Sequence, residues 1–462
     1  MRFSKTISNK FDCFALNFQL YLDNIGCVSA KQFQTSLIVL HSTFTIFAKN
    51  TKPNNMKNLL KFKVAMLAMV AGLGLWSCSS DEGKVQYVPV KLDGEDKWSI
   101  LDTKSGEIVC ENDFDNMPSM VKDGLFVVQN KRGDYEMYDV GDSKNAVSKG
   151  KYSQLGLFNG DVTFAVKSGK GIVVINKDFE EVKKLSDKIT QTINYTEGLA
   201  AFCKNGKWGY LDEKGEEAIS AKYDAVTIFH EGLAFVQKGD RIMLIDKKGE
   251  TIKSFSSEKY ELAGSLYNEG YCPMMKGDKV VFLDKKGEES SDFSNSKMER
   301  GYCYGVNDGK TIYTDGDEFG IVDKSGEIVL RAKYENLTYA SPDRYIAEDS
   351  DGKWGVITAE GEEIIPFDYA SIVQMSTDKS HYFAFEDSDW ILIDEKGEQV
   401  GTEEFSDFNP RTEAIDQFYS EANQDDEMDY SVDAPAYYEP ANDSVAVEEP
   451  IYDYESDYDY EY

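Results

Sequence analysis

A glycine-containing turn recurs along the chain at nearly constant spacing. Seven such turns are clear, and the last five steps between their glycines are 34, 38, 39, 35 and 36 residues. The first step, of 109 residues, leaves room for two less regular copies, around residues 138–141 and 175–178. A period near 36 residues, repeated about nine times, predicts a tandem array in which each unit packs mainly on its neighbours. The turn glycines are Gly106, Gly215, Gly249, Gly287, Gly326, Gly361 and Gly397.

Residues 198–226 show what one unit contains. Leu199–Phe202 is typical of a strand, and Asn205-Gly206 predicts a tight hairpin because both residues tolerate a positive φ. Trp208–Asp212 forms the next strand, and the glycine-containing turn then reverses the chain into Glu217–Ser220. Each unit is therefore expected to be a meander of three or four short strands.

Tryptophan marks one position of this unit. Trp98, Trp208, Trp354 and Trp390 occupy the same slot in different copies. A lone meander has little core, so an aromatic repeated in this way is expected to pack between units and not to form a binding row.

The expected fold is all-β, with tandem meanders arranged as in a β-propeller, where radial closure protects the strand edges. The alternative is an open β-solenoid or superhelix. Cys272 and Cys303 occupy like positions in adjacent copies. Like positions lie about 4.8 Å apart in a parallel solenoid, so a disulfide between these two cysteines would favour the open form.

The motifs of residues 94–408 resemble a known repeat family. Lys-Trp-Gly occurs at 207–209 and again at 353–355, and acidic glycine turns follow at 212–217 and 359–363. These stretches are similar to the bacterial WG repeat. The resemblance implies a β-rich repeat domain, often found on exported proteins, and implies no defined chemistry.

A possible export signal lies inside the chain. Lysines follow Met56, and residues 64–75 form an apolar run of 12 residues, too short to span a hydrocarbon core of roughly 30 Å as a helix. The run ends in Leu75-Trp76-Ser77-Cys78, which resembles a bacterial lipoprotein cleavage box. The resemblance implies a signal peptide at 56–77 and lipid attachment at Cys78.

The signal divides the N-terminal part of the chain into three stretches. Residues 1–55 are then a disordered leader or an over-extended reading frame, and residues 78–93 a tether. Serine after the modified cysteine implies an outer-membrane lipoprotein, and the acidic residues that follow it point to possible surface exposure.

Charge is concentrated at the C-terminus. The whole chain carries a formal charge of -33, which argues against nucleic-acid binding. Residues 411–462 contain 17 acids, one base and nine tyrosines. Residues 409–462 are therefore expected to form a disordered acidic tail.

No residue set points to catalysis. The chain has three histidines, no C-x-x-C pair and no G-x-S-x-G motif, so neither a metal site nor a catalytic residue is expected, and no cofactor. Cys110 and Cys203, with the two cysteines named above, are apolar fillers or disulfide partners.

The expected function is that of a non-enzymatic binding or scaffold protein of the envelope. Its expected partners are the membrane, through the lipid, and envelope proteins or glycans. An envelope hydrolase using paired carboxylates and a structural or adhesive surface protein are the alternatives.

Overall fold

A computed structural model describes residues 86–262, 266–277, 279–294, 305–374, 380–411 and 416–420. Every regular element in these residues is a strand. No helix in this part of the chain has the length and apolarity needed to cross a bilayer. The expectation of an all-β chain is confirmed.

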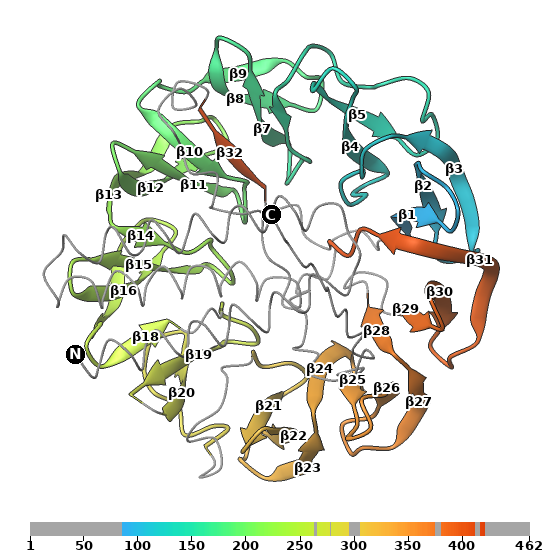
Figure 1. Cartoon of the computed structure of the whole chain (residues 1–462). Helices are drawn as coiled ribbons and strands as arrows, with labels where there is room; N and C mark the ends of the chain where they lie inside the picture. The colour runs from blue at the N-terminus through green and yellow to red at the C-terminus, as the bar shows by residue number, and fades with distance from the viewer. Residues whose placement is uncertain are drawn as a thin grey trace, which may run out of the picture. The chain divides into compact units, whose positions relative to one another are not determined.

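The strands follow one another as nine antiparallel meanders, which Figure 1 shows in chain order. The first four meanders contain β1 (Tyr87–Leu92), β2 (Trp98–Asp102) and β3 (Glu107–Phe114); β4 (Leu125–Gln129) and β5 (Tyr135–Asp139); β6 (Gln154–Leu155), β7 (Val162–Lys167), β8 (Gly171–Asn176) and β9 (Glu181–Lys184); and β10 (Ile189–Ile193), β11 (Leu199–Lys204), β12 (Lys207–Asp212) and β13 (Glu217–Tyr223). The next three contain β14 (Ala225–Val226), β15 (Leu233–Lys238), β16 (Arg241–Asp246) and β17 (Thr251–Ser256); β18 (Tyr260–Leu262), β19 (Tyr271–Lys276) and β20 (Lys279–Asp284); and β21 (Lys310–Asp315), β22 (Glu318–Asp323) and β23 (Ile328–Tyr334). The last two contain β24 (Asn336–Ser341), β25 (Arg344–Glu348), β26 (Trp354–Ile357) and β27 (Glu363–Tyr369); and β28 (Ser371–Gln374), β29 (His381–Glu386), β30 (Asp389–Asp394) and β31 (Gln399–Phe408).

The fourth meander has the local structure predicted from its sequence. Asn205 and Gly206 have φ values of 52° and 73°, so the hairpin between β11 and β12 uses two left-handed residues. Gly215, in the turn before β13, has a φ of 72°. We call the three turns of a complete meander the 1–2 turn, the 2–3 hairpin and the 3–4 turn, in chain order.

Hydrophobic clusters lie between neighbouring meanders. Phe164 of the third meander shares one cluster with Phe202 and Leu211 of the fourth. The opposite face of the fourth meander places Tyr210 in another cluster with Val236 of the fifth. A strand places alternate side chains on opposite faces, so one meander contributes side chains to the clusters on both of its sides.

The first and last meanders share one sheet. β31 pairs with β30 and then continues to pair with β1, with Val90 opposite Phe408, as Figure 1 shows. The register repeats that of the fifth meander, where Val226 lies opposite Val236. The end of β31 is therefore the first strand of the first meander, although the two belong to opposite ends of the repeat domain.

A core cluster confirms this closure. It joins Val88 and Val90 of the first meander to Phe383, Phe405 and Phe408 of the ninth. The array returns on itself, which agrees with the propeller-like expectation and not with an open superhelix.

Two strands lie outside residues 94–408, the span that the sequence analysis assigned to repeats. β1 falls in the stretch 78–93 that was expected to be a tether. β32 (Gln417–Tyr419) falls in the stretch 409–462 that was expected to be disordered, and it pairs with β10. β1 pairs with the neighbouring β2 and with the distant β31, and the partner of β32, β10, is also far away in sequence. The leader, the signal peptide, Cys78 and Cys303 lie outside the described residues.

Candidate functional site

The repeated tryptophans lie in or against the clusters. Trp98 and Trp354 are buried, whereas Trp208 and Trp390 are partly buried. Trp98 shares its cluster with Phe126 of the following meander. This environment gives the aromatic slot a packing role, because the ring fills the space between two sheets.

The glycine that follows the slot lies under the backbone of the fourth strand. A Cβ at Gly209 would lie 2.4 Å from Ile219 O, and a Cβ at Gly320 would lie 2.5 Å from Leu330 O. The pairing register shifts on both sides of each glycine, so the fourth strand bulges over it. The Trp-Gly pair therefore couples a large side chain to a close backbone contact.

The aspartate of the 3–4 turn binds its own backbone. Asp212 Oδ1 accepts hydrogen bonds from Lys214 N and Glu216 N, both at 2.9 Å. Asp246 and Asp284 accept the equivalent pairs in the next two meanders. Local bonds of this kind hold the turn, so these carboxylates serve structure.

A carboxylate in the 1–2 turn reaches the next meander. Glu197 Oε2 accepts from Gly232 N at 2.9 Å, and Glu231 Oε2 accepts from Gly270 N at 2.9 Å. Glu269 Oε2 accepts from Gly309 N at 2.8 Å. The 1–2 turns of successive meanders therefore lie along one side of the domain, and their acids fasten neighbours together.

The 2–3 hairpins are at the opposite ends of the same strands, because adjacent strands are antiparallel. They are exposed, and the net charge of each hairpin is positive in the second to sixth meanders and negative in the seventh, eighth, ninth and first. The positive hairpins also contain Asp134, Asp240 and Asp278, and the negative ones also contain Lys97 and Lys353. The third and fourth meanders carry two lysines each and no acid in this hairpin, whereas the seventh and ninth carry three acids each and no base. The basic run contains Lys131, Arg132, Lys167, Lys170, Lys204, Lys207, Lys238, Arg241, Lys276 and Lys279. The acidic run contains Asp315, Asp317, Glu318, Asp349, Asp351, Glu386, Asp387, Asp389, Asp93, Glu95 and Asp96.

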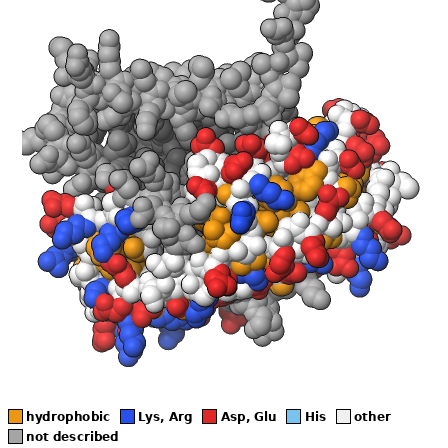
Figure 2. All heavy atoms as spheres, turned by 90° about the horizontal axis from the view of Figure 1, so that it is seen from below, with side chains coloured by type: hydrophobic (Ala, Val, Ile, Leu, Met, Phe, Trp, Pro, Cys, Tyr) orange, Lys and Arg blue, Asp and Glu red, His pale blue; other side chains and the backbone are white. Residues whose placement is uncertain are grey.

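Charges of both signs are mixed on the face of the molecule that Figure 2 shows, where Lys and Arg side chains lie next to Asp and Glu with hydrophobic side chains between them. Five lysines of the basic run also have a carboxylate neighbour each, as in Lys167–Glu181 and Lys204–Glu217.

Arg132, Lys170 and Arg241 differ from those five lysines. They are exposed and have no ion-pair partner among the residues described. These three cations are well placed to meet an anionic ligand, because none of them forms an ion pair with a described carboxylate.

The segment 416–420 docks on the third and fourth meanders, a contact that the sequence analysis did not predict. Phe418 lies opposite Thr192 of β10, is buried, and has its ring 5.6 Å from that of Phe164. A Cβ at Gly156 would lie 2.5 Å from Phe418 Cζ. The pocket for this ring exists because residue 156 has no side chain.

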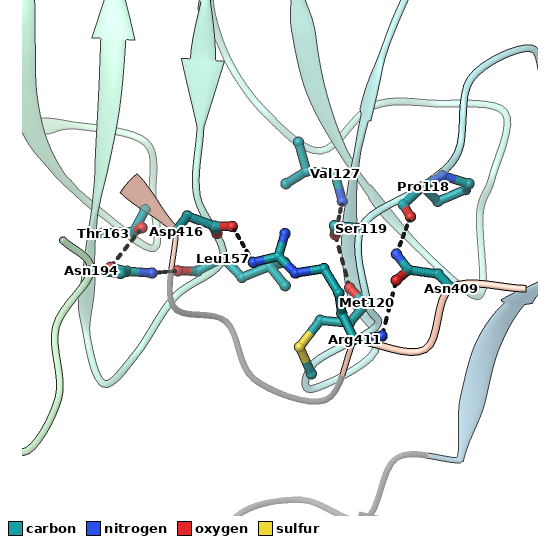
Figure 3. A network of polar contacts seen from close by, with 10 residues as sticks. All are labelled: Pro118, Ser119, Met120, Val127, Leu157, Thr163, Asn194, Asn409, Arg411 and Asp416. Atoms are coloured by element: carbon teal, nitrogen blue, oxygen red, sulfur yellow. Dashed lines mark hydrogen bonds and ion pairs between the residues drawn. The ribbon is translucent and has the colours of Figure 1, made fainter. Parts of the chain in front are cut away.

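Polar contacts hold Asn409, Arg411 and Asp416 in place (Figure 3). Asn409 Nδ2 donates to Pro118 O at 2.7 Å. Arg411 Nη2 lies 2.9 Å from Asp416 Oδ1, and Asp416 O accepts from Asn194 N at 2.9 Å. The segment is thus held at both of its described ends.

Comparisons with known proteins bear on the repeat and on the fold. Residues 174–208 and 208–241 match a family model described as WG containing repeat. Residues 174–241 therefore carry two WG-containing repeats. No curated protein sequence matches the chain.

The solved structures that resemble this chain do so at low identity. BamB from Moraxella catarrhalis is 14% identical with a TM-score of 0.35, covering 62% of this chain and 99% of BamB. A eukaryotic initiation factor is 10% identical with a TM-score of 0.45, covering 74% and 98%. Hsv2 from Kluyveromyces lactis is 9% identical with a TM-score of 0.29, covering 45% and 78%.

One buried carboxylate stands apart from the acids of the repeat turns. Glu348 is buried, burial raises the pKa of its carboxyl group, and the Asn336 side chain donates a hydrogen bond to it. The partner is an amide and not a second acid. Among the described residues no cluster of His, Cys, Asp or Glu could hold a metal ion.

The cysteines of the described strands fill apolar space. Cys110 and Cys203 are buried thiols outside any disulfide, and Cys272 is also buried. Burial raises the pKa of the Cys110 thiol, which disfavours the reactive thiolate. Of the two roles considered for these cysteines, the structure agrees with packing.

Proposed function

We propose that this chain is an outer-membrane lipoprotein, anchored through Cys78, whose repeat domain is a non-catalytic binding or scaffold module. Its partners are envelope proteins or glycans, and its 2–3 hairpins form the binding face. The coarser part, a repeat module suited to binding, is supported by the WG-containing repeats and the propeller-like fold. The anchor and the address are supported by the sequence around Cys78.

One observation carries the choice of face. The acids of the 1–2 turns are used in contacts between meanders, whereas the hairpin charges project from exposed turns and are sorted by sign. Exposed charges whose net sign is sorted along an array suit recognition of a charged partner.

The first experiment tests the anchor. Cells make the native chain or Cys78→Ala, and membranes are washed with high salt. The native chain should remain in the membrane fraction and gain the mass of a lipid, and the alanine variant should do neither. Equal membrane retention of the two chains would contradict the lipid anchor.

The second experiment tests the binding face. The membrane-bound native chain is cross-linked in cells and isolated, with Arg132→Ser/Lys170→Ser/Arg241→Ser as the variant. The matched control is Lys214→Ser/Lys248→Ser/Lys286→Ser, which changes exposed lysines of the 3–4 turns. One set of envelope proteins or glycans should be recovered with the native chain and the control, and lost with the triple variant. Recovery that does not depend on the hairpins would contradict this face.

The third experiment tests the absence of catalysis. The purified native chain is incubated with envelope glycans, and the products are analysed. No turnover is expected. Turnover that is lost on Glu348→Gln would instead favour a hydrolase.

A further inference from the structure

The 2–3 hairpins of one sign follow one another around the closed array. The hairpins of the second to the sixth meanders have net charges of +1, +2, +2, +1 and +1. Those of the seventh, eighth, ninth and first meanders have net charges of -3, -1, -3 and -2. The positive group therefore totals +7 and the negative group -9, so one face of the domain carries two large charges of opposite sign and similar size.

The segments that connect one meander to the next lie on the same side as these hairpins and repeat their signs. Lys151 is exposed and precedes Tyr152, whose carbonyl accepts a hydrogen bond from Tyr135 N beside the positive hairpin of the second meander. Glu404 is exposed, and its carbonyl accepts from Asp93 N in the negative hairpin of the first meander. The separation by sign therefore extends beyond the hairpins themselves.

Closure places the two groups opposite each other. The nine meanders form a closed array, because β31 pairs with β1. The fourth meander is the middle of the positive group, and it is four steps from the eighth meander in one direction and four steps from the ninth in the other. The middle of the positive group thus lies across the array from the middle of the negative group.

This arrangement makes the face complementary to a second copy of itself. Consider a two-fold axis that lies between two such faces and crosses the hairpin of the sixth meander. It brings the fifth hairpin of one copy onto the seventh of the other, the fourth onto the eighth, the third onto the ninth and the second onto the first. Each pair joins a positive hairpin to a negative one, and each occurs twice, because a two-fold interface uses the same surface on both copies.

Both groups offer charges for such contacts. Three exposed cations and three exposed acids of these hairpins have no ion-pair partner among the described residues. The cations are Arg132, Lys170 and Arg241, and the acids are Asp317, Asp351 and Asp387. One exposed ion pair contributes little, so the association depends on several pairs, each made twice. Near 0.1 M salt, charges more than about 10 Å apart are largely screened, so the facing hairpins outweigh the repulsion between two chains of charge -33.

We propose that the partner recognised by the 2–3 hairpins is a second copy of this chain, bound face to face with the positive hairpins of each copy on the negative hairpins of the other. The proposal rests on the proposed role of the hairpins as the binding face, and it identifies the envelope protein bound there as this chain itself. An anionic glycan would use the positive hairpins alone, whereas a second copy uses both groups.

The test measures the molar mass of the full chain by analytical ultracentrifugation. Every sample carries Cys78→Ala, so that no lipid can drive association. The chain should sediment as a dimer in about 0.1 M salt and as a monomer in about 1 M salt, where the Debye length falls to about 3 Å. A monomer in the lower salt, at tens of micromolar protein, would overturn the proposal.

Two variants locate the interface. Arg132→Ser/Lys170→Ser/Arg241→Ser and Asp317→Asn/Asp351→Asn/Asp387→Asn should each raise the dissociation constant of the dimer about tenfold or more, because each lost contact is lost twice. The matched control is Lys214→Ser/Lys248→Ser/Lys286→Ser, which changes exposed lysines of the 3–4 turns on the other side and should leave the dissociation constant unchanged. A dimer that neither hairpin variant weakens would overturn the proposal.

Mixing the two hairpin variants tests the two-fold arrangement. In a dimer of either variant with itself, both halves of the interface lack charges on one side. In a dimer of one variant with the other, one half joins native positive hairpins to native negative ones. The equimolar mixture should therefore associate more tightly than either variant alone. A mixture that associates no more tightly would overturn the face-to-face arrangement.

This proposal and the proposed function fail in different ways. The ultracentrifuge cell contains no envelope component. A monomer there, together with hairpin-dependent recovery of other envelope molecules in cells, would overturn the pairing of two copies and leave the binding face in place. A salt-sensitive dimer that the hairpin variants weaken would support the pairing even if no other envelope molecule were recovered.

Discussion

The junction between the fourth and fifth meanders differs from the junction between the ninth and the first in what lies under the glycine of the 3–4 turn. In the former, Gly249 of a 3–4 turn lies on a side chain of the preceding meander, with its Cβ position 3.2 Å from Ile219 Cγ2. In the latter, Gly106 lies on backbone, with its Cβ position 2.8 Å from Gly401 N. Gly401 occupies the β31 position that corresponds to Ile219 in β13.

The difference shows how a repeat array closes. Inside the array one meander leads directly into the next, and aliphatic side chains lie under Gly249, Gly361 and Gly397. Gly326 is the exception, because its Cβ position lies 2.4 Å from Ser294 O. At closure the ends of the domain meet, and the absence of an aliphatic side chain lets two backbones approach. Lys91 and Ser406, which contact each other there, are 315 residues apart in sequence. Closure therefore keeps the strand register of the repeat and changes its packing.

The largest effect is expected when the end of β31, which closes the array, is removed. A chain that ends at Glu404 lacks Phe405 and Phe408, which are buried in the shared core, and each such loss is worth about 3–5 kcal/mol. We expect loss of the sharp thermal transition and of near-ultraviolet circular dichroism.

The control for that truncation is a chain ending at Ser420, which retains every described strand and should melt close to the native chain. If the chain ending at Glu404 melted at the same temperature, the first and last meanders would not depend on each other.

The next largest effect is expected at the ordinary junction. Ile219→Ala leaves a cavity under Gly249 and should lower the free energy of unfolding by about 2–5 kcal/mol. Chemical denaturation measures the change. Ile252→Ala is the matched control, since Ile252 is 40% exposed on β17, and it should cost much less. Similar losses for both would mean that the junction is not set by this side chain.

The closing junction should respond to the opposite change. Gly401→Ala adds a methyl group 2.8 Å from Gly106 O at a φ of 80°, and should cost about 1–3 kcal/mol. Gly94→Ala separates the two causes, because Gly94 has a φ of 71° and open space at its Cβ position. The excess of the first loss over the second measures the backbone approach. No excess would show that the junction can relax.

Sequence reasoning found the parts of the fold that are local. The hairpin at Asn205-Gly206 and the turn at Gly215 follow from which residues accept a positive φ, and both were predicted. The slot shared by Trp208 and Trp354 revealed the repeat.

Local sequence patterns did not predict the closure of the array or the docking of β32. The first strand of the first meander is the end of β31, where Asp407 and Phe408 pair with β1, and two residues carry no periodic signal. β32 is three residues long inside an acidic segment, and composition alone predicts disorder there. A signal was present in Gly156, a glycine outside any turn motif, but its reason is a ring 262 positions later. The sorting of the hairpin charges was readable from the sequence once the hairpins had been placed.

The smallest change in the free energy of unfolding is expected at the polar contact between two neighbouring meanders. Glu231 Oε2 accepts from Gly270 N at 2.9 Å and lies 3.4 Å from Lys285 Nζ. Glu231→Ala removes both contacts and should cost about 1.5 kcal/mol, because the amide loses a charged acceptor. Glu231→Gln keeps an acceptor and loses only the exposed ion pair, so its cost should be below about 1 kcal/mol. Chemical denaturation of both variants, with Glu250→Ala in a 3–4 turn as control, measures the split. If glutamine cost as much as alanine, charge and not the hydrogen bond would join these meanders, and the loss would then shrink with added salt.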